Sequence, residues 1–111
     1  MPELTVVVPT FNEVENLAAL VAEVGRALAG VDWELLFVDD DSPDGTADRA
    51  RDIAQADRRV RCLQRIGRRG LASACVEGML ASSAPYVAVM DGDLQHDPAV
   101  LAAMLDRKSV V

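Results

Sequence analysis

The chain has 111 residues, 50% of them hydrophobic, and a formal net charge of −7 at neutral pH. This length fits one small domain with a single core. The negative charge argues against a nucleic-acid-binding protein, because such domains carry a basic surface that meets the phosphates. The sequence contains no run of about 18 apolar residues and no signal-peptide pattern, so a cytoplasmic chain without a membrane span is expected.

Positive charge and cysteine are the two local features of the composition. The segment from Arg49 to Arg69 holds eight arginines and two acids. Most of these arginines are expected to be solvated charges of helices and loops, and only Arg68 and Arg69, beside a glycine, are candidates for an anion contact. Cys62 and Cys75 lie in apolar segments without metal-like spacing, so both are expected to be buried, reduced thiols.

Apolar runs that predict strands alternate along the chain with amphipathic patterns that predict helices. Residues 4–8 predict a buried strand, and a first helix follows that ends near Gly30, with Asn12 and Glu15 as its capping box. Further strands are predicted at 33–38, 60–63 and 86–90, and further helices at 46–56 and 71–81. Asp97 and Pro98 are expected to start a last helix. This order predicts an α/β fold with a mainly parallel sheet and helices on both faces.

Polar residues follow three of the four predicted strands. These are residues 10–13 (TFNE), 39–42 (DDDS) and 91–93 (DGD). Because ligands bind at the carboxyl ends of parallel strands, the three loops are expected to form one site. The first of them has no glycine and carries Glu13, which excludes a glycine-rich dinucleotide turn. Residues 42–46 (SPDGT) are expected to be a structural corner.

The third loop has the pattern of a metal site. Alternate residues of an extended segment point the same way, so Asp91 and Asp93 would present two carboxylates to one point. Mg²⁺ and Mn²⁺ prefer oxygen ligands and keep positions open for phosphates, and Gly92 leaves room for that approach. Gln95 could add an oxygen or orient a metal-bound water. His96, the only histidine, is expected to be a helix-start contact rather than a ligand.

Three segments closely resemble the donor-site motifs of polyprenol-phosphate (dolichol-phosphate) mannosyltransferases. They are residues 9–13 (PTFNE), 38–46 (VDDDSPDGT) and 90–98 (MDGDLQHDP). These relatives are inverting enzymes of glycosyltransferase family 2 with the GT-A, Rossmann-like fold. The resemblance runs from about residue 4 to residue 105, and its mild departures are Phe11 for the commoner tyrosine and Gly92 for the commoner alanine. It implies that mannose is transferred from GDP-mannose to a polyprenyl (dolichyl) phosphate with the help of Mn²⁺ or Mg²⁺.

The resemblance also assigns roles to single residues. Asp91 and Asp93 take the catalytic role, because together with Gln95 they look like the metal site. Asp39 would face the other side of its strand and support the loop. Residues 70–74 resemble the segment that opens the third helix near the donor, which gives Arg69 and Ser73 weaker roles. The residues implied to bind the nucleotide are Pro9, Phe11, Glu13, Val38, Asp40, Asp91, Gly92 and Asp93.

The family's chemistry needs charge compensation more than a general base. Negative charge builds on the departing diphosphate, where a divalent ion stabilises it. The acceptor phosphate is already ionised and attacks once it is positioned. Relatives continue well beyond residue 111, into the part that holds this acceptor at the membrane surface. Residues 1–111 are therefore expected to be the N-terminal, nucleotide-sugar-binding part only, on the cytoplasmic side, with donor binding but without turnover.

Three other readings stay open at this stage. A UDP-sugar-dependent polyprenyl-phosphate glycosyltransferase would use the same kind of donor loops. A metal-dependent phosphatase also uses paired aspartates, but its nucleophile usually follows the first strand, where this chain has residues 10–13 (TFNE). The chain could also be a non-catalytic fragment that binds a nucleotide or packs against a partner.

Overall fold

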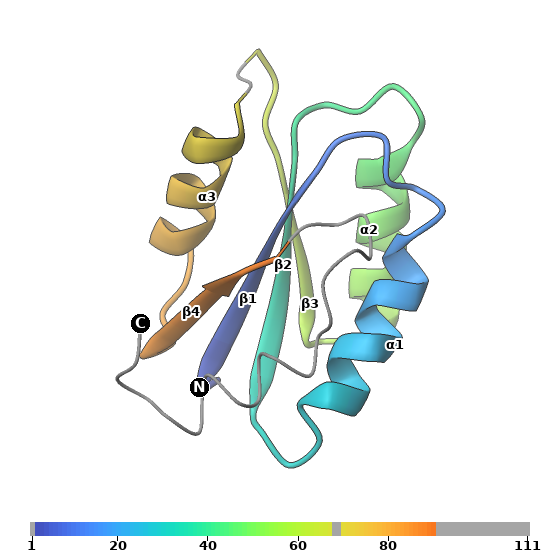
Figure 1. The fold of residues 1–111 in the computed structure, drawn as a ribbon. Coiled ribbons are helices and arrows are strands. Elements are labelled where there is room, and N and C mark those ends of the chain that lie inside the picture. The colour runs from blue at the N-terminus through green and yellow to red at the C-terminus, as the bar shows by residue number, and fades with distance from the viewer. Residues whose placement is uncertain (1, 68–69, 91–111) are drawn as a thin grey trace.

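The computed structural model describes residues 2–67 and 70–90 as one parallel sheet between two layers of helices (Figure 1). The predicted strands and helices are confirmed, with bounds within two residues of those expected, except at the start of the first helix. The expected last helix at Asp97 and Pro98 lies outside the described residues. In chain order the elements are β1 (Leu4–Thr10), α1 (Leu17–Ala27), β2 (Trp33–Asp39), α2 (Thr46–Ala56), β3 (Val60–Gln64), α3 (Leu71–Leu80) and β4 (Tyr86–Val89).

The sheet has the strand order β3-β2-β1-β4, and all of its pairs are parallel. The last pair of β1 and β2 joins Thr10 to Asp39, and that of β1 and β4 joins Val7 to Val89. The chain adds β2 and β3 on one side of β1 and then crosses to the other side for β4. This reversal creates a topological switch point at the carboxyl ends of β1 and β4, where sheets of this kind bind their ligands.

Helices cover both faces of the sheet, as predicted. Among the described elements, Figure 1 shows α1 and α2 on one face of the sheet and α3 on the other. Alternate residues of a strand point to opposite faces, so the two apolar cores share β1. Val6 and Val8 belong to the larger core beneath α1 and α2, and Val7 belongs to the smaller core beneath α3. A strand buried on both sides explains the β-branched run without polar alternation.

A glycine allows α3 to lie close to the sheet. A Cβ atom built on Gly78 would stand 2.4 Å from Val7 Cγ1 and 3.1 Å from Val38 Cγ2. Both distances are shorter than an ordinary contact between carbon atoms, which is about 3.5–4.0 Å. Only a residue without a side chain therefore fits at position 78 with the helix at this height.

The first helix starts later than the sequence pattern predicts. Asn12 does not cap it, because Asn12 has a left-handed backbone (φ 58°) and the helix begins at Leu17 after Asn16. The reason is tertiary: the backbone amides of residues 12–14 donate to side chains of the loop between β2 and α2 and of Thr46, the first residue of α2. These bonds draw the segment into a loop in place of a first helical turn. Gly30 lies just beyond the end of the helix with φ 85°, as expected for a stop.

The cysteines differ from the prediction in their burial. Cys62 and Cys75 are both free, as expected, but each is only partly buried, so the prediction that both thiols are buried was wrong. Burial still raises the pKa of the Cys62 thiol. Among the residues that the structure describes, no helix is long and apolar enough to cross a bilayer.

Candidate functional site

The candidate site is built on the carboxyl ends of β1 and β2, where Asp39 supports the loops. Asp39 is fully buried, and its carboxylate accepts a hydrogen bond from Thr10 Oγ1 (2.9 Å). It also accepts two bonds from Ser42, one from the backbone amide (2.9 Å) and one from the hydroxyl (2.6 Å). A buried carboxylate needs such partners to replace the hydrogen bonds that it would make with water. Asp39 therefore joins the two strand ends from within, which confirms its predicted role as a support of the loop.

The backbone of the loop after β1 is attached to the loop before α2 and to the first residue of α2. The amide of Asn12 donates to Ser42 Oγ at 2.9 Å, that of Glu13 to Thr46 Oγ1 at 3.1 Å, and that of Val14 to Asp44 Oδ2 at 3.4 Å. Asp44 also accepts the Thr46 hydroxyl, and this bond is the main reason that the pKa of Asp44 lies below its usual value. Residues 42–46 are thus the structural corner that the sequence predicted.

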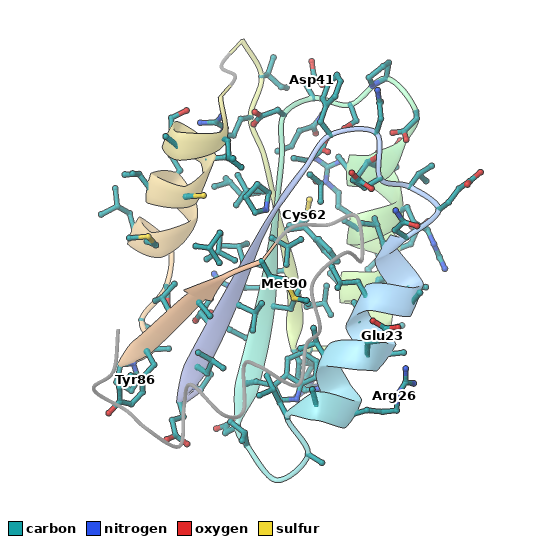
Figure 2. All side chains as sticks on the ribbon, in the orientation of Figure 1. Glu23, Arg26, Asp41, Cys62, Tyr86 and Met90 are labelled. Carbon is teal, nitrogen blue, oxygen red and sulfur yellow. The ribbon has the colours of Figure 1, made fainter. Side chains whose placement is uncertain are left out.

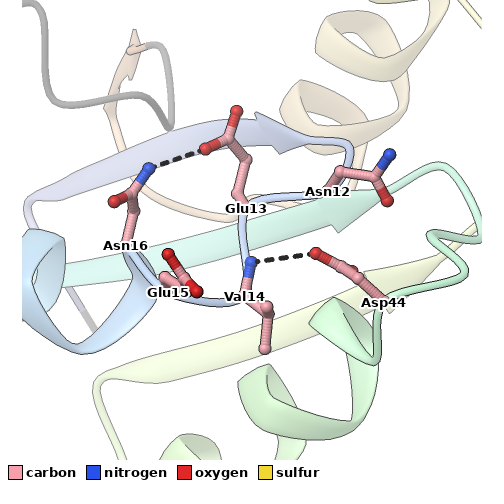
Figure 3. Close-up of a pocket in the computed structure, with 6 residues that line it drawn as sticks. All are labelled: Asn12, Glu13, Val14, Glu15, Asn16 and Asp44. Carbon is pink, nitrogen blue, oxygen red and sulfur yellow. Dashed lines mark hydrogen bonds between the residues drawn. The ribbon is translucent and has the colours of Figure 1, made fainter.

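A polar hollow of about 330 Å³ opens beside this attachment. Figure 3 shows the side chains that line it, among which Asn16 Nδ2 donates to Glu13 Oε2 at 2.8 Å. The lining has three carboxylates and no basic side chain, so by itself it offers no counter-charge to a phosphate. Groups that donate hydrogen bonds, such as the hydroxyls of a ribose or the N–H groups of a base, suit it better. The lining residues are Asn12, Glu13, Val14, Glu15, Asn16 and Asp44.

A buried arginine organises the other side of the same sheet edge. Arg65 follows β3 directly, and its side chain has 0% exposure. Nε donates to Asp40 Oδ1 at 2.7 Å and Nη2 to Asp40 Oδ2 at 3.0 Å, which is a bidentate pair. Nη1 reaches Glu77 on α3 at 2.6 Å. We call the residues that meet here the Arg65 cluster: Asp40, Arg65, Gly70, Ser73 and Glu77.

This cluster corrects one prediction and was missed by the sequence reasoning. Most of the arginines between 49 and 69 were expected to be solvated charges, but Arg65 is one of the largest fully buried side chains in the described part of the chain. The two carboxylates around it compensate its charge, and hydrogen bonding to Asp40 is the main reason that its pKa is raised. The available signal was its position, directly after an apolar strand at the ligand-binding edge.

The predicted nucleotide residues that the structure describes lie at or near this edge, but they differ in access. Phe11 is 40% exposed, just beyond the end of β1. Asp40 is less open, with a side-chain exposure of 13%. Pro9 and Glu13 are half-buried. Val38 is fully buried in the core beneath α3, so its side chain has no surface for a ligand.

The predicted metal residues lie outside the described part of the chain. This holds for Asp91, Gly92, Asp93 and Gln95, and for Arg68 and Arg69 as well. Within residues 2–67 and 70–90, no group of three or more potential ligands could hold a metal ion. Met90, the residue before Asp91 in the sequence, lies at the switch point, where its amide donates to the carbonyl of Val7 at 3.0 Å. Figure 2 shows Met90 beside the end of β4, with Asp41 and Tyr86 labelled at opposite ends of the sheet.

Comparison with known sequences decides the family. A family model described as glycosyl transferase family 2 matches residues 5–109. This chain belongs to glycosyl transferase family 2. A dolichol-phosphate mannosyltransferase of Pyrococcus furiosus is 38% identical over 104 residues, and one of Saccharomyces cerevisiae is 34% identical over 110 residues. Each match covers 94% of this chain but only 29% and 40% of the respective relatives, so the chain spans less than half of their length.

Comparison with solved structures confirms the GT-A fold of this family 2 chain. The mannosyltransferase PcManGT of Pyrobaculum calidifontis, solved in complex with GDP-Man and Mn²⁺, has a TM-score of 0.69 and 26% identity. That match covers 83% of this chain and 28% of PcManGT. Glucosyl-3-phosphoglycerate synthase of Mycobacterium tuberculosis has a TM-score of 0.75 at 22% identity, covering 98% of this chain and 40% of the synthase. At that identity the likeness shows the fold alone.

Proposed function

We propose that residues 1–111 are the donor-binding part of a metal-dependent, inverting glycosyltransferase that transfers mannose from GDP-mannose to a polyprenyl phosphate. The observation that carries this proposal is that a chain of glycosyl transferase family 2 places a polar edge at the ends of β1 and β2. Relatives named dolichol-phosphate mannosyltransferase support the lipid acceptor. A structural relative solved with GDP-Man and Mn²⁺ supports the donor and the metal.

The described residues suit the nucleoside half of such a donor. Carboxylates accept hydrogen bonds, and Glu13 and Asp40 lie on the two loops that end β1 and β2, joined by bonds from Thr10 and Asn12. The exposed ring of Phe11 offers an apolar face that a base can stack against. Because the edge carries acids, a diphosphate needs a cation between it and the protein. Asp91, Asp93 and Gln95 carry carboxylate and amide oxygens, which are the ligands that such a cation prefers.

The residues divide the work of the reaction. A bound Mn²⁺ or Mg²⁺ would compensate the charge that develops on the departing diphosphate. Asp91 and Asp93 would hold that ion, and Gly92 would leave space for the donor beside it. Glu13 and Asp40 would hold the nucleoside, so that the anomeric carbon faces the acceptor. The acceptor phosphate is already ionised and needs position more than a base.

The direct test is calorimetry of GDP-mannose binding with and without Mn²⁺. We expect the wild-type chain to bind only when Mn²⁺ is present, and Asp93→Ala to bind at least tenfold more weakly, since it loses a charged ligand of the ion. His96→Ala is the matched control from the same segment and should bind like the wild type. Equal affinity of Asp93→Ala and the wild type would overturn the proposal.

Two further measurements separate the alternatives. Titration with UDP-glucose under the same conditions should give much weaker binding than GDP-mannose, and stronger binding would favour a UDP-sugar enzyme. Incubation of residues 1–111 with GDP-mannose, Mn²⁺ and a short polyprenyl phosphate should give no transfer product. Robust product would refute the assignment of this segment to donor binding alone.

A further inference from the structure

Arg65 has no N–H group left with which to contact a ligand. A guanidinium carries five N–H donors. In the Arg65 cluster Nε and one Nη2 donor go to Asp40, and the second Nη2 donor goes to the Gly70 carbonyl at 3.0 Å. The two Nη1 donors go to Glu77 and to Ser73 Oγ, the latter at 2.9 Å. Arg65 is also fully buried, so any effect on a ligand must pass through its partners.

The partners of Arg65 sit on separate elements. Asp40 lies in the loop that follows β2, Arg65 follows β3, and Gly70 and Glu77 belong to the start and body of α3. A guanidinium is planar, so fixing one edge of it fixes the direction of the other edge. Glu77 and Ser73 hold the Nη1 side, and this leaves the Nε and Nη2 side facing Asp40. The ion pair with Glu77 therefore sets the direction from which Asp40 is held.

Gly70 closes the arrangement around the same carboxylate. Its amide donates to Asp40 Oδ2 at 3.1 Å, while its carbonyl accepts from Arg65 and from the Ser73 hydroxyl. Gly70 has φ 125°, a backbone conformation in which a residue with a side chain would be strained. The start of α3 is thus tied to Asp40 twice, once directly and once through Arg65.

We propose that Arg65 and Glu77 are positioning residues for Asp40, which set the orientation of its carboxylate toward the nucleotide. This inference rests on the proposed function, in which Asp40 holds the nucleoside. Loss of the Glu77 charge releases one edge of the guanidinium and lets the carboxylate of Asp40 turn. Donor affinity then falls although Glu77 lies on another element and does not hold the nucleotide.

The chain supplies a matched control for Glu77. Glu34 also accepts a bond from an arginine of the β3 segment, because Arg61 Nη2 donates to Glu34 Oε1 at 2.9 Å. Glu34 is the second residue of β2, so this pair lies at the end of the sheet away from the site. Glu77→Gln and Glu34→Gln make the same chemical change, since each keeps an acceptor oxygen and loses the charge.

The experiment compares the affinities of these variants for GDP-mannose with Mn²⁺ by calorimetry. We expect Glu77→Gln to weaken binding by roughly threefold to thirtyfold, the range for residues that act through others, and Glu34→Gln to leave it unchanged. In the Asp40→Asn background, adding Glu77→Gln should change the affinity no further, because its effect passes through Asp40. Unchanged affinity in Glu77→Gln, or an equal loss in Glu34→Gln, would overturn the inference.

A second readout needs no nucleotide and separates this inference from the proposed function. The Gly70 amide donates to Asp40, so its hydrogen exchange, followed by NMR, reports whether that carboxylate keeps its place. We expect Glu77→Gln to speed this exchange and Glu34→Gln to leave it alone. Exchange that stays at the wild-type rate in Glu77→Gln would overturn the positioning role. Failure of the wild type to bind GDP-mannose would instead overturn the proposed function.

Discussion

Replacing Gly78 by alanine tests how closely α3 approaches the sheet. The new Cβ would stand 2.4 Å from Val7 Cγ1, more than about 1 Å inside an ordinary carbon contact. Val7 belongs to β1, an inner strand of the described sheet, and is fully buried, so moving its side chain would disturb the smaller core. Overpacking of this kind costs roughly 1–3 kcal/mol, and the better helix propensity of alanine offsets up to about 1 kcal/mol. We expect a net loss of about 1–2 kcal/mol in the free energy of unfolding.

Urea unfolding measures this loss, and another glycine provides the control. With an m-value of about 2 kcal/mol/M, the midpoint of Gly78→Ala should fall by roughly 0.5–1 M. Gly25 lies inside α1, where a built Cβ would reach Trp33 at 3.4 Å, so Gly25→Ala should be neutral or slightly stabilising. Adding Val7→Ala to Gly78→Ala removes the closest atoms, and the pair should cost less than the sum of the single changes. A midpoint of Gly78→Ala at or above that of the wild type would refute the reasoning.

Three further predictions concern charge and burial. Arg65→Met should lower the free energy of unfolding by roughly 2–4 kcal/mol in thermal or urea unfolding, since it strands two carboxylates, although their partial exposure softens the loss. The pKa of Asp44 is lowered chiefly by the hydrogen bond from the Thr46 hydroxyl. The contribution of Asp44 to stability is therefore present above its unfolded pKa and is lost as pH falls below about 4. Thr46→Val should raise the titration midpoint of Asp44 measured by NMR, and an unchanged midpoint would contradict this cause. Burial raises the pKa of Cys62, so alkylation by iodoacetamide at pH 8 should be several times slower in the folded chain than in urea, and equal rates would show that the thiol is open.

The order of strands and helices could be predicted because periodicity and burial agree along this chain. The double burial of β1, the helical spacing of α1 and the glycines at turns are all local signals. The start of α1 could not be predicted in the same way. The spacing of Asn12 and Glu15 is that of a capping box. In the structure, however, the backbone amides of residues 12–14 donate to side chains some thirty positions later in the sequence.

Some features of the candidate site could likewise be predicted from the sequence, and others could not. Residues at strand ends, such as Asp39 and Asp40, could be placed from the parallel order alone, because every parallel strand ends at the same edge. The partnership between Asp40 and Arg65 could not, since it depends on how β3 and α3 approach each other in space. Arg65 also lies within a dense run of arginines, and composition carries no information about which side chain of such a run is buried.

The way in which the first loop is attached leaves its chemistry open to change. Residues 12–14 are held by hydrogen bonds from their backbone amides. The accepting side chains belong to Ser42, Asp44 and Thr46 in a different part of the chain. Replacing the side chains of residues 13 and 14 by any residue except proline therefore keeps these amide bonds, whereas replacing Ser42, Asp44 or Thr46 removes an acceptor. A library that varies residues 13 and 14 and keeps Ser42, Asp44 and Thr46 would change the lining of the polar hollow while its supporting bonds stay in place.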